Sequence, residues 1–234
     1  MKKWKVYTLA SMMALCSGFV KADDFEKGVA AIGYGNYAAA LKSFHAAAMR
    51  GDVRAQYNLG VMYGDGQGVQ QDYAQARQWY RKAAEQGYGY AQYNLGIMYL
   101  YGQGVTPDRF EAIRWFRLSA PQGVAKSQLM LGLAYHLGQG VAQNYSEALK
   151  WLRLSAAQGD ADAQSNLGSM YYAGLGVAQD TMRAHMWFYI SAAKGNGSSQ
   201  KYRDITAQKM TAAKIASAQR MGQDCIQNNY KNCD

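Results

Sequence analysis

A short run that recurs every 36 residues constrains this chain more than any other feature of its sequence. The run Ala55–Gly60 (AQYNLG) returns at Ala91–Gly96, Ser127–Gly132 and Ala163–Gly168. A fixed period of about 20 to 50 residues is typical of stacked supersecondary units that cannot bury their apolar faces alone. The sequence therefore predicts a solenoid, an architecture that presents an extended surface to other molecules.

Residue spacing within one period predicts two helices and a connecting loop. We expect helices over Val53–Tyr63 and Tyr73–Gln86, joined by a loop over Gly64–Gln71. Short polar residues recur where the second helix needs an N-cap: Asp72, Asp108, Asn144 and Asp180. Glycines recur after that helix, where a left-handed residue reverses the chain: Gly87, Gly123, Gly159 and Gly195. The predicted fold class is all-α.

Apolar residues repeat in the same register and predict the core. Leucine and tyrosine recur on the first helix and tryptophan on the second: Leu59, Leu95, Leu131, Leu167, Tyr63, Tyr99, Tyr135, Tyr171, Trp79, Trp115, Trp151 and Trp187. Small residues, such as Ala76 and Gly60 with their equivalents, allow the two helices to approach closely. Because a tryptophan stands at the same position in every unit, we interpret the tryptophans as core residues and not as a ligand cage.

The consensus of these units resembles a known repeat family. The pattern A-x-x-x-A-Q-x-N-L-G-x-M-Y-x-x-G-x-G-V, an acidic cap and A-x-x-W-Y-x-x-A-A-x-Q-G is similar to the Sel1-like repeat family, which is related to tetratricopeptide repeats. The resemblance covers residues 53–195 in four units. It implies a right-handed α/α superhelical solenoid whose first helices line a concave face. It also implies an adaptor or receptor for other proteins rather than a catalyst.

The two ends of the chain depart from the repeat. Residues 1–22 combine a basic start, an apolar stretch and an A-x-A-like site, which is typical of a cleaved secretory signal peptide. Residues 23–52 resemble a shorter, tetratricopeptide-style helix pair and are predicted to form an atypical N-terminal cap. Residues 196–234 are predicted to close the solenoid with helices over Gln200–Lys209 and Ala212–Gln223, the second one capped by Thr211.

Cysteine usage and the tail point to an extracytoplasmic location. Signal cleavage would remove Cys16 and leave Cys225 and Cys233 as an even pair in an exported chain, so we expect a disulfide between them. The tail from Asp224 onward resembles that of exported family members of Gram-negative bacteria. We therefore expect a periplasmic or secreted protein with no integral membrane span after signal cleavage.

Charge argues against nucleic acid as the partner. Loss of Lys2, Lys3, Lys5 and Lys21 with the signal would lower the formal net charge from +9 to +5. That balance is too modest for a nucleic-acid-binding chain of this length. The expected partner is another protein, with a wall polymer or a membrane surface as alternatives.

Catalytic and metal-binding patterns are weak. His45, His136 and His185 lie in three different units, so each is expected to be a partly exposed helix residue rather than a ligand. Two S-x-x-K matches, Ser191–Lys194 and Ser198–Lys201, allow the alternative of a wall-associated, penicillin-binding or β-lactamase-like enzyme, but the companion motifs are absent. We therefore predict a non-enzymatic protein without cofactor or metal.

Positions that vary between units indicate where a partner could bind. The predicted concave-face residues are Tyr57, Tyr93, Ile97, Leu100, Tyr101, Leu133, His136 and Tyr172. Several are apolar or aromatic where a solvated face would be charged, so they could anchor a helix or an extended peptide. The same residues would equally fit simple packing between neighbouring first helices, and the sequence leaves both interpretations open.

Basic residues recur on the outer face of the second helices. They are predicted to form a basic stripe: Arg81, Arg114, Arg117, Lys150 and Arg153. Such a stripe could bind an acidic protein, peptidoglycan or anionic lipid, or it could be a solvated face. The leading hypothesis remains an exported solenoid that binds a protein through its concave face. It would act as an envelope adaptor or scaffold, or as an immunity protein that neutralises a toxic effector delivered to the periplasm.

Overall fold

The computed structural model describes residues 23–231 and 233, and the predicted signal peptide lies outside this range. The described part is all-α, as predicted, with twelve α-helices, one short 3-10 turn and no strand. The helices are α1 (Asp24–Gly33), α2 (Tyr37–Met49), α3 (Val53–Asp65), α4 (Tyr73–Glu85), α5 (Gly89–Tyr101), α6 (Arg109–Ser119), α7 (Ala125–Leu137), α8 (Tyr145–Ala156), α9 (Ala161–Ala173), α10 (Thr181–Ala193), α11 (Gly197–Ala207) and α12 (Ala212–Gln227). The 3-10 turn, η1 (Ala120–Gln122), follows α6.

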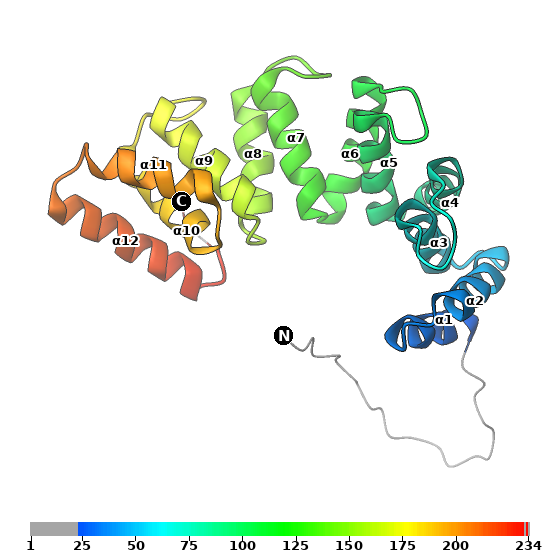
Figure 1. Cartoon of the computed structure of the whole chain (residues 1–234). Helices are drawn as coiled ribbons and strands as arrows, with labels where there is room; N and C mark the ends of the chain where they lie inside the picture. The colour runs from blue at the N-terminus through cyan, green and yellow to red at the C-terminus, as the bar shows by residue number, and fades with distance from the viewer. Residues whose placement is uncertain (1–22, 232, 234) are drawn as a thin grey trace, which may run out of the picture.

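Successive helix pairs pack one after another along a curved path (Figure 1). Each first helix of a repeat (α3, α5, α7, α9) packs against the second helix of its own unit (α4, α6, α8, α10) and against the second helix of the preceding pair. This arrangement is a solenoid, in which each unit buries its apolar side against its neighbours.

Capping follows the predicted residues, while the first helix runs further than predicted. The side chain of Asp72 accepts hydrogen bonds from the backbone N–H groups of Ala74 and Gln75, and Asp108 and Asp180 cap α6 and α10 in the same way. Asn144 caps α8 with one such bond, from the N–H of Glu147. Helix α3 continues to Asp65 rather than ending at Tyr63. The helix ends only where Gly66 takes the left-handed conformation with φ of +71°.

The core contains most of the predicted apolar ladder, although Tyr63 and Tyr135 are only half-buried. The four repeat leucines are fully buried: Leu59, Leu95, Leu131 and Leu167. Trp79, Trp115 and Trp187 are buried and Trp151 is half-buried. The glycine of the N-L-G run allows the close approach, because a Cβ atom on Gly60 would lie 2.4 Å from the ring of Tyr80. A side chain there would force the two helices apart.

The two ends close the solenoid. At the N-terminus, Phe44 of α2 lies directly over Gly28 of α1, where a Cβ would approach the ring to 2.5 Å. At the C-terminus, α12 packs against α10, with Thr211 as its N-cap. Helix α11 begins at Gly197, because Asn196 provides an N-cap earlier than predicted, and α12 continues to Gln227 rather than Gln223.

The tail is joined to the end of α12 by the predicted disulfide. Cys225 and Cys233 are bonded across a Cα–Cα distance of 5.1 Å, and Cys225 is buried in the core around α10. None of the helices in the described range has both the length and the hydropathy of a membrane-spanning helix.

Candidate functional site

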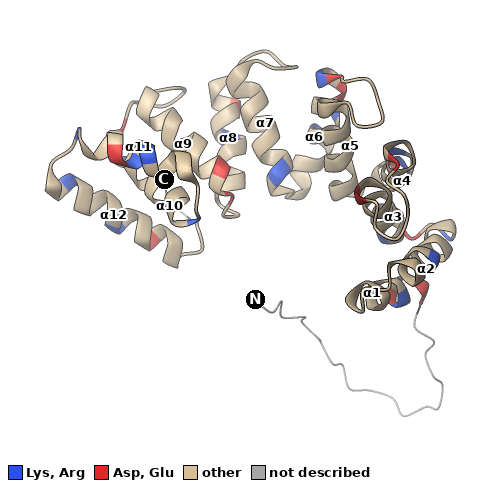
Figure 2. Ribbon diagram, in the orientation of Figure 1, with Lys and Arg blue, Asp and Glu red and all other residues tan. Residues whose placement is uncertain are grey.

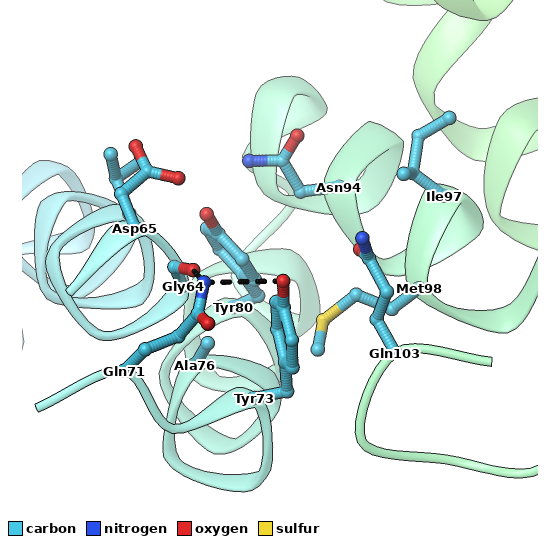
Figure 3. A pocket seen from close by; sticks show the side chains of 11 residues that line it. Gly64, Asp65, Gln71, Tyr73, Ala76, Tyr80, Asn94, Ile97, Met98 and Gln103 are labelled. Atoms are coloured by element: carbon cyan, nitrogen blue, oxygen red, sulfur yellow. Dashed lines mark hydrogen bonds between the residues drawn. The ribbon is translucent and has the colours of Figure 1, made fainter. Parts of the chain in front are cut away.

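Two cavities lie on either side of helix α5. The first has a volume of about 370 Å³ and is shown in Figure 3. Its lining combines polar and aromatic side chains from α3, α4, α5 and the adjoining loops: Val61, Gly64, Asp65, Gln71, Tyr73, Ala76, Tyr80, Asn94, Ile97, Met98 and Gln103. The Gln71 amide donates to the Gly64 carbonyl at 2.7 Å and to the Tyr73 hydroxyl at 3.2 Å, which fixes the loop edge of the cavity.

The second cavity lies between α5, α6 and α7 and has a volume of about 210 Å³. Its lining is mostly apolar: Leu100, Tyr101, Arg109, Ile113, Phe116, Met130, Leu133, Ala134, Leu137 and Gln139. Tyr101 and Leu137 are 65% and 54% exposed, so they form an apolar rim that faces solvent. Both volumes are at or below the low end of small-molecule sites, about 300–1,000 Å³. They are suited to single side chains of a partner rather than to a cofactor.

The two cavities are the same feature in consecutive repeats. Tyr80, Ile97 and Gln103 of the first cavity correspond to Phe116, Leu133 and Gln139 of the second, each 36 residues later. We call the pair of cavities, with α5 between them, the first-helix groove. Since the backbone repeats, the residues that differ between the two cavities determine what each one can accept.

Four of the eight predicted concave-face residues line this groove. Ile97 lines the first cavity, and Leu100, Tyr101 and Leu133 line the second. Tyr57 lies beside the groove, with its ring centroid 5.9 Å from that of Tyr80 in the first cavity. Tyr57 also contacts Tyr88 and Tyr90 at centroid distances of 5.2 and 6.3 Å, which makes a tyrosine cluster at the start of α5.

Tyr93 lies beside the groove in the same way as Tyr57, half-buried with its ring centroid 6.0 Å from that of Phe116 in the second cavity. The other two predicted residues have structural neighbours instead. His136 packs against Tyr145 at 5.8 Å. Tyr172 receives a hydrogen bond from Lys209, which follows α11, so the C-terminal cap covers this end of the row. For these positions the structure favours packing, which was one of the two interpretations that the sequence left open.

Several groove residues escaped the sequence analysis. Asp65, Arg109, Met130 and Leu137 all line the cavities. Asp65 was assigned to the loop, and no binding role was predicted for Arg109, Met130 or Leu137. A comparison of equivalent positions would have revealed them, since Asp65, Tyr101 and Leu137 occupy one repeat position and differ in chemistry.

Electrostatics in the first cavity reflect burial and one carboxylate. Burial raises the pKa of the Tyr80 hydroxyl, and the nearby Tyr57 hydroxyl and Asp65 carboxylate raise this pKa further. The pKa of Tyr57 is raised mainly by burial as well, with a contribution from Asp65. Both hydroxyls therefore remain protonated hydrogen-bond donors at neutral pH.

The residues of the predicted basic stripe have partners within the chain. Arg81, Arg117 and Arg153 each donate to the tyrosine hydroxyl of the next first helix, namely Tyr99, Tyr135 and Tyr171, at 2.9 to 3.2 Å. Arg114 and Lys150 pair with Glu111 and Glu147 on their own helices, at 3.0 and 3.4 Å. Basic residues (blue) and acidic residues (red) are interspersed along the ribbon (Figure 2). Binding of a partner through the basic stripe stays a prediction. Within the chain, Arg81, Arg117 and Arg153 contact the next unit, whereas Arg114 and Lys150 pair within their own helices.

The catalytic candidates are placed by the repeat. The Ser191 side chain is fully buried, and its hydroxyl donates to the Ala161 carbonyl at 2.7 Å, as Ser119 and Ser155 do to Gly89 and Ala125. Ser191 is thus a repeat residue, whereas Ser198 and Lys201 are exposed on α11. Within residues 23–231 and 233, no group of three or more His, Cys, Asp or Glu side chains could hold a metal ion.

One histidine differs from its predicted environment. We expected all three histidines to be partly exposed, but His185 is buried between α10 and α11, with Nδ1 2.9 Å from Thr206 Oγ1. The reason is that the C-terminal cap covers the face of α10 that carries His185.

Comparisons with known proteins agree with this architecture. The sequence profile described as Sel1 repeat matches the chain four times, at residues 53–88, 89–124, 125–160 and 161–196. No curated protein sequence matches the chain. Among solved structures, the chain is similar to a Sel1 repeat protein from Oxalobacter formigenes, with 35% identity and a TM-score of 0.72 over 76% of this chain and 74% of the other. It is also similar to a protective antigen of uropathogenic Escherichia coli with an SLR fold, with 40% identity and a TM-score of 0.73. That match covers 77% of this chain but only 39% of the antigen.

Proposed function

The chain belongs to the Sel1 repeat family, and we propose that it is an exported, non-enzymatic solenoid that binds a protein partner through the first-helix groove. Sel1 repeat proteins are generally scaffolds for protein interactions. In this chain, we assign the protein-binding role to the first-helix groove.

The observation that carries the proposal is the exposed apolar rim of the second cavity. Tyr101 and Leu137 stand one repeat apart on α5 and α7 and remain more than half exposed, beside a cavity whose lining is mostly apolar. Burial of such side chains by a partner is favourable by about 25 cal/mol per Å² of apolar surface. Aromatic anchors next to small pockets are also typical of the energetically dominant residues in protein interfaces.

Export is part of the proposal and is supported by both ends of the chain. Residues 1–22 have the pattern of a secretory signal peptide, and the Cys225–Cys233 disulfide suits an oxidising compartment. We therefore place the protein in the periplasm or outside the cell, where its partner would be an envelope or incoming protein.

Two roles are compatible with such a binding protein. It would serve as an envelope adaptor or scaffold, or as an immunity protein that neutralises a toxic effector. Co-expression with a candidate toxin distinguishes them, because only an immunity protein protects the cell against the toxin. A scaffold would instead be required for the assembly or activity of a resident envelope complex.

Affinity purification tests the proposed surface. Residues 23–234 are used as bait in periplasmic extract under mild crosslinking, beside the double variant Tyr101→Ser with Leu137→Ser. The matched control replaces Leu118 and Leu154, which are 47% and 45% exposed on the second helices α6 and α8. We expect one protein to be recovered by wild type and the control, and to be lost with the groove variant. Equal recovery by all three baits would refute the proposal.

A further inference from the structure

The two cavities of the first-helix groove differ in charge as well as in polarity. Asp65 is the only carboxylate in the lining of the first cavity, and Arg109 is the only cation in the lining of the second. Both side chains are exposed, and neither forms an ion pair or a side-chain hydrogen bond with another residue of the described range. The neighbouring Asp108 carboxylate is occupied, because it accepts the backbone N–H groups of Phe110 and Glu111.

Both charges also stand at helix ends where the backbone disfavours them. Asp65 is the last residue of α3, and Arg109 is the first residue of α6. A helix C-terminus disfavours a negative charge and a helix N-terminus disfavours a positive one, by about 0.3–1 kcal/mol each. The equivalent residues in the other units are uncharged: Tyr101, Leu137 and Ala173 for Asp65, and Tyr73, Tyr145 and Thr181 for Arg109. The repeat fold thus requires neither charge.

Unpaired charges at unfavourable positions beside cavities indicate a complementary ligand. A carboxylate near Arg109 and a cation near Asp65 would each relieve the unfavourable field at a helix end. The apolar lining of the second cavity, with Leu100 and Leu133, would take a large apolar side chain. The Gln103 amide in the first cavity suits a polar, hydrogen-bonding side chain instead.

We propose that the groove selects a partner segment by this charge order. The segment carries an apolar residue, which occupies the second cavity, next to an acidic residue, which pairs with Arg109. The segment then crosses α5, and a basic residue further along it pairs with Asp65. The inference rests on the proposed function, because it names the chemistry of the protein segment that the groove binds.

Short peptide probes test the charge order directly. Fluorescein-labelled peptides carry a Leu-Glu pair and a lysine at increasing spacing in a Gly/Ser background. A second set exchanges the two charges, giving Leu-Lys with a glutamate. Binding to residues 23–234 is followed by fluorescence anisotropy at low salt, where charge pairs are least screened.

Charge reversal provides the decisive comparison. We expect wild type to prefer the Leu-Glu set, Arg109→Glu to weaken that set about five- to tenfold, and the same variant to bind the exchanged set better. Asp65→Lys should act in the same direction. The control Lys214→Glu makes the same charge change on α12, far along the chain, and should leave the preference unaltered. Rescue by the exchanged peptides separates a direct contact from damage to the fold.

The outcomes distinguish this inference from the proposed function. If wild type binds both sets equally, or none of the probes, the charge order is refuted. If Arg109→Glu weakens both sets to the same extent, Arg109 is structural and the inference fails. If the variant Tyr101→Ser with Leu137→Ser abolishes binding while the charge variants do not, the groove binds protein segments without charge selection. In that case the proposed function stands alone.

Discussion

In the first three repeats, the glutamine of the recurring run (Gln56, Gln92 and Gln128) joins its own helix to two other segments of the chain through one buried amide. Gln92 donates to the Ala84 carbonyl at the end of the preceding second helix, and its oxygen accepts a hydrogen bond from Gln122. The same pattern holds for Gln56 with Gln86 and for Gln128 with Gln158. In the fourth unit, Lys194 replaces the donor and bonds the Gly159 carbonyl instead, which leaves Gln164 Oε1 without a partner in the described range.

This difference predicts unequal costs for the same substitution. Gln92→Leu breaks the contacts to both Ala84 and Gln122, whereas Gln164→Leu removes only the hydrogen bond to the Ala156 carbonyl. Because each buried hydrogen bond contributes about 1 kcal/mol, Gln92→Leu should lower the free energy of unfolding by about 1 kcal/mol more. Urea unfolding of both variants measures the difference. Equal losses would contradict the role assigned to the Gln92–Gln122 contact.

The arginine–tyrosine contacts explain why a basic residue recurs on the second helix. Arg81, Arg117 and Arg153 stand eighteen residues before the tyrosine that each contacts, so each bond links one unit to the next. Each such hydrogen bond contributes about 0.5–1.5 kcal/mol to stability. The three bonds link every pair of consecutive repeats in the same way.

At the scale of elements, the long loop of each repeat lies on the start of the preceding second helix. A Cβ atom on Gly104, which has φ of +64°, would lie 2.7 to 2.9 Å from backbone and Cβ atoms of Tyr73. Gly68 and Gly176 meet Tyr37 and Tyr145 in the same way. The glycine therefore serves two needs at once, namely a left-handed backbone and contact with the neighbouring helix.

Alanine scanning of two glycines separates these needs. Gly87→Ala should cost only the left-handed conformation, about 1–2 kcal/mol, because its φ is +89° and nothing lies within 4 Å of the new Cβ. Gly104→Ala adds the clash with Tyr73 and should cost about 1–3 kcal/mol more. Thermal and urea unfolding report both values. If the two variants are equally stable, the loop does not rest on α4 as described.

The junction between α10 and α11 predicts pH-dependent stability. The Thr206 hydroxyl donates its single proton to the Arg203 carbonyl, so the hydrogen bond between His185 Nδ1 and Thr206 is assigned Nδ1 as its donor. The other ring nitrogen, Nε2, is buried and has no partner in the described range. A proton on Nε2 would be buried without an acceptor. Burial is accordingly the main cause that lowers the pKa of His185 below its ordinary value of 6.5.

The sign of the effect follows from proton uptake. Below pH 6.5 the unfolded chain binds a proton that the folded chain excludes, so stability falls as the pH drops toward the lowered pKa. The loss for one such group is at most about 1.4 kcal/mol per pH unit. His185→Gln should reduce this slope between neutral pH and pH 5, and His45→Gln, at an exposed position, should not. Identical slopes for wild type and both variants would contradict the environment assigned to His185.

At the scale of the whole molecule, the repeat made the fold predictable and the groove only partly so. The N-cap residues, the left-handed glycines and the leucine ladder follow from spacing, because the same local chemistry is needed in every unit. The contact between Arg81 and Tyr99 could not be predicted, since it depends on how two units rotate relative to each other. The same holds for the C-terminal cap over Tyr172 and His185, which no repeat position encodes.

The groove illustrates the same limit. Ile97, Leu100, Tyr101 and Leu133 were predicted because they vary between units and are apolar or aromatic. Asp65 was missed because its helix was expected to end at Tyr63, two residues too early. Cavities form from side chains of three helices, so their outline required the packed structure.

Photo-crosslinking in the native host tests the central claim most directly. A photoreactive phenylalanine analogue is placed in turn at Tyr101, Leu137, Leu118 and Leu154, all of which are exposed enough to accept it without disturbing the core. If the first-helix groove binds the partner, irradiation will give one crosslinked protein species from positions 101 and 137 and none from positions 118 and 154. Crosslinks to that protein only from the second-helix positions would contradict the account.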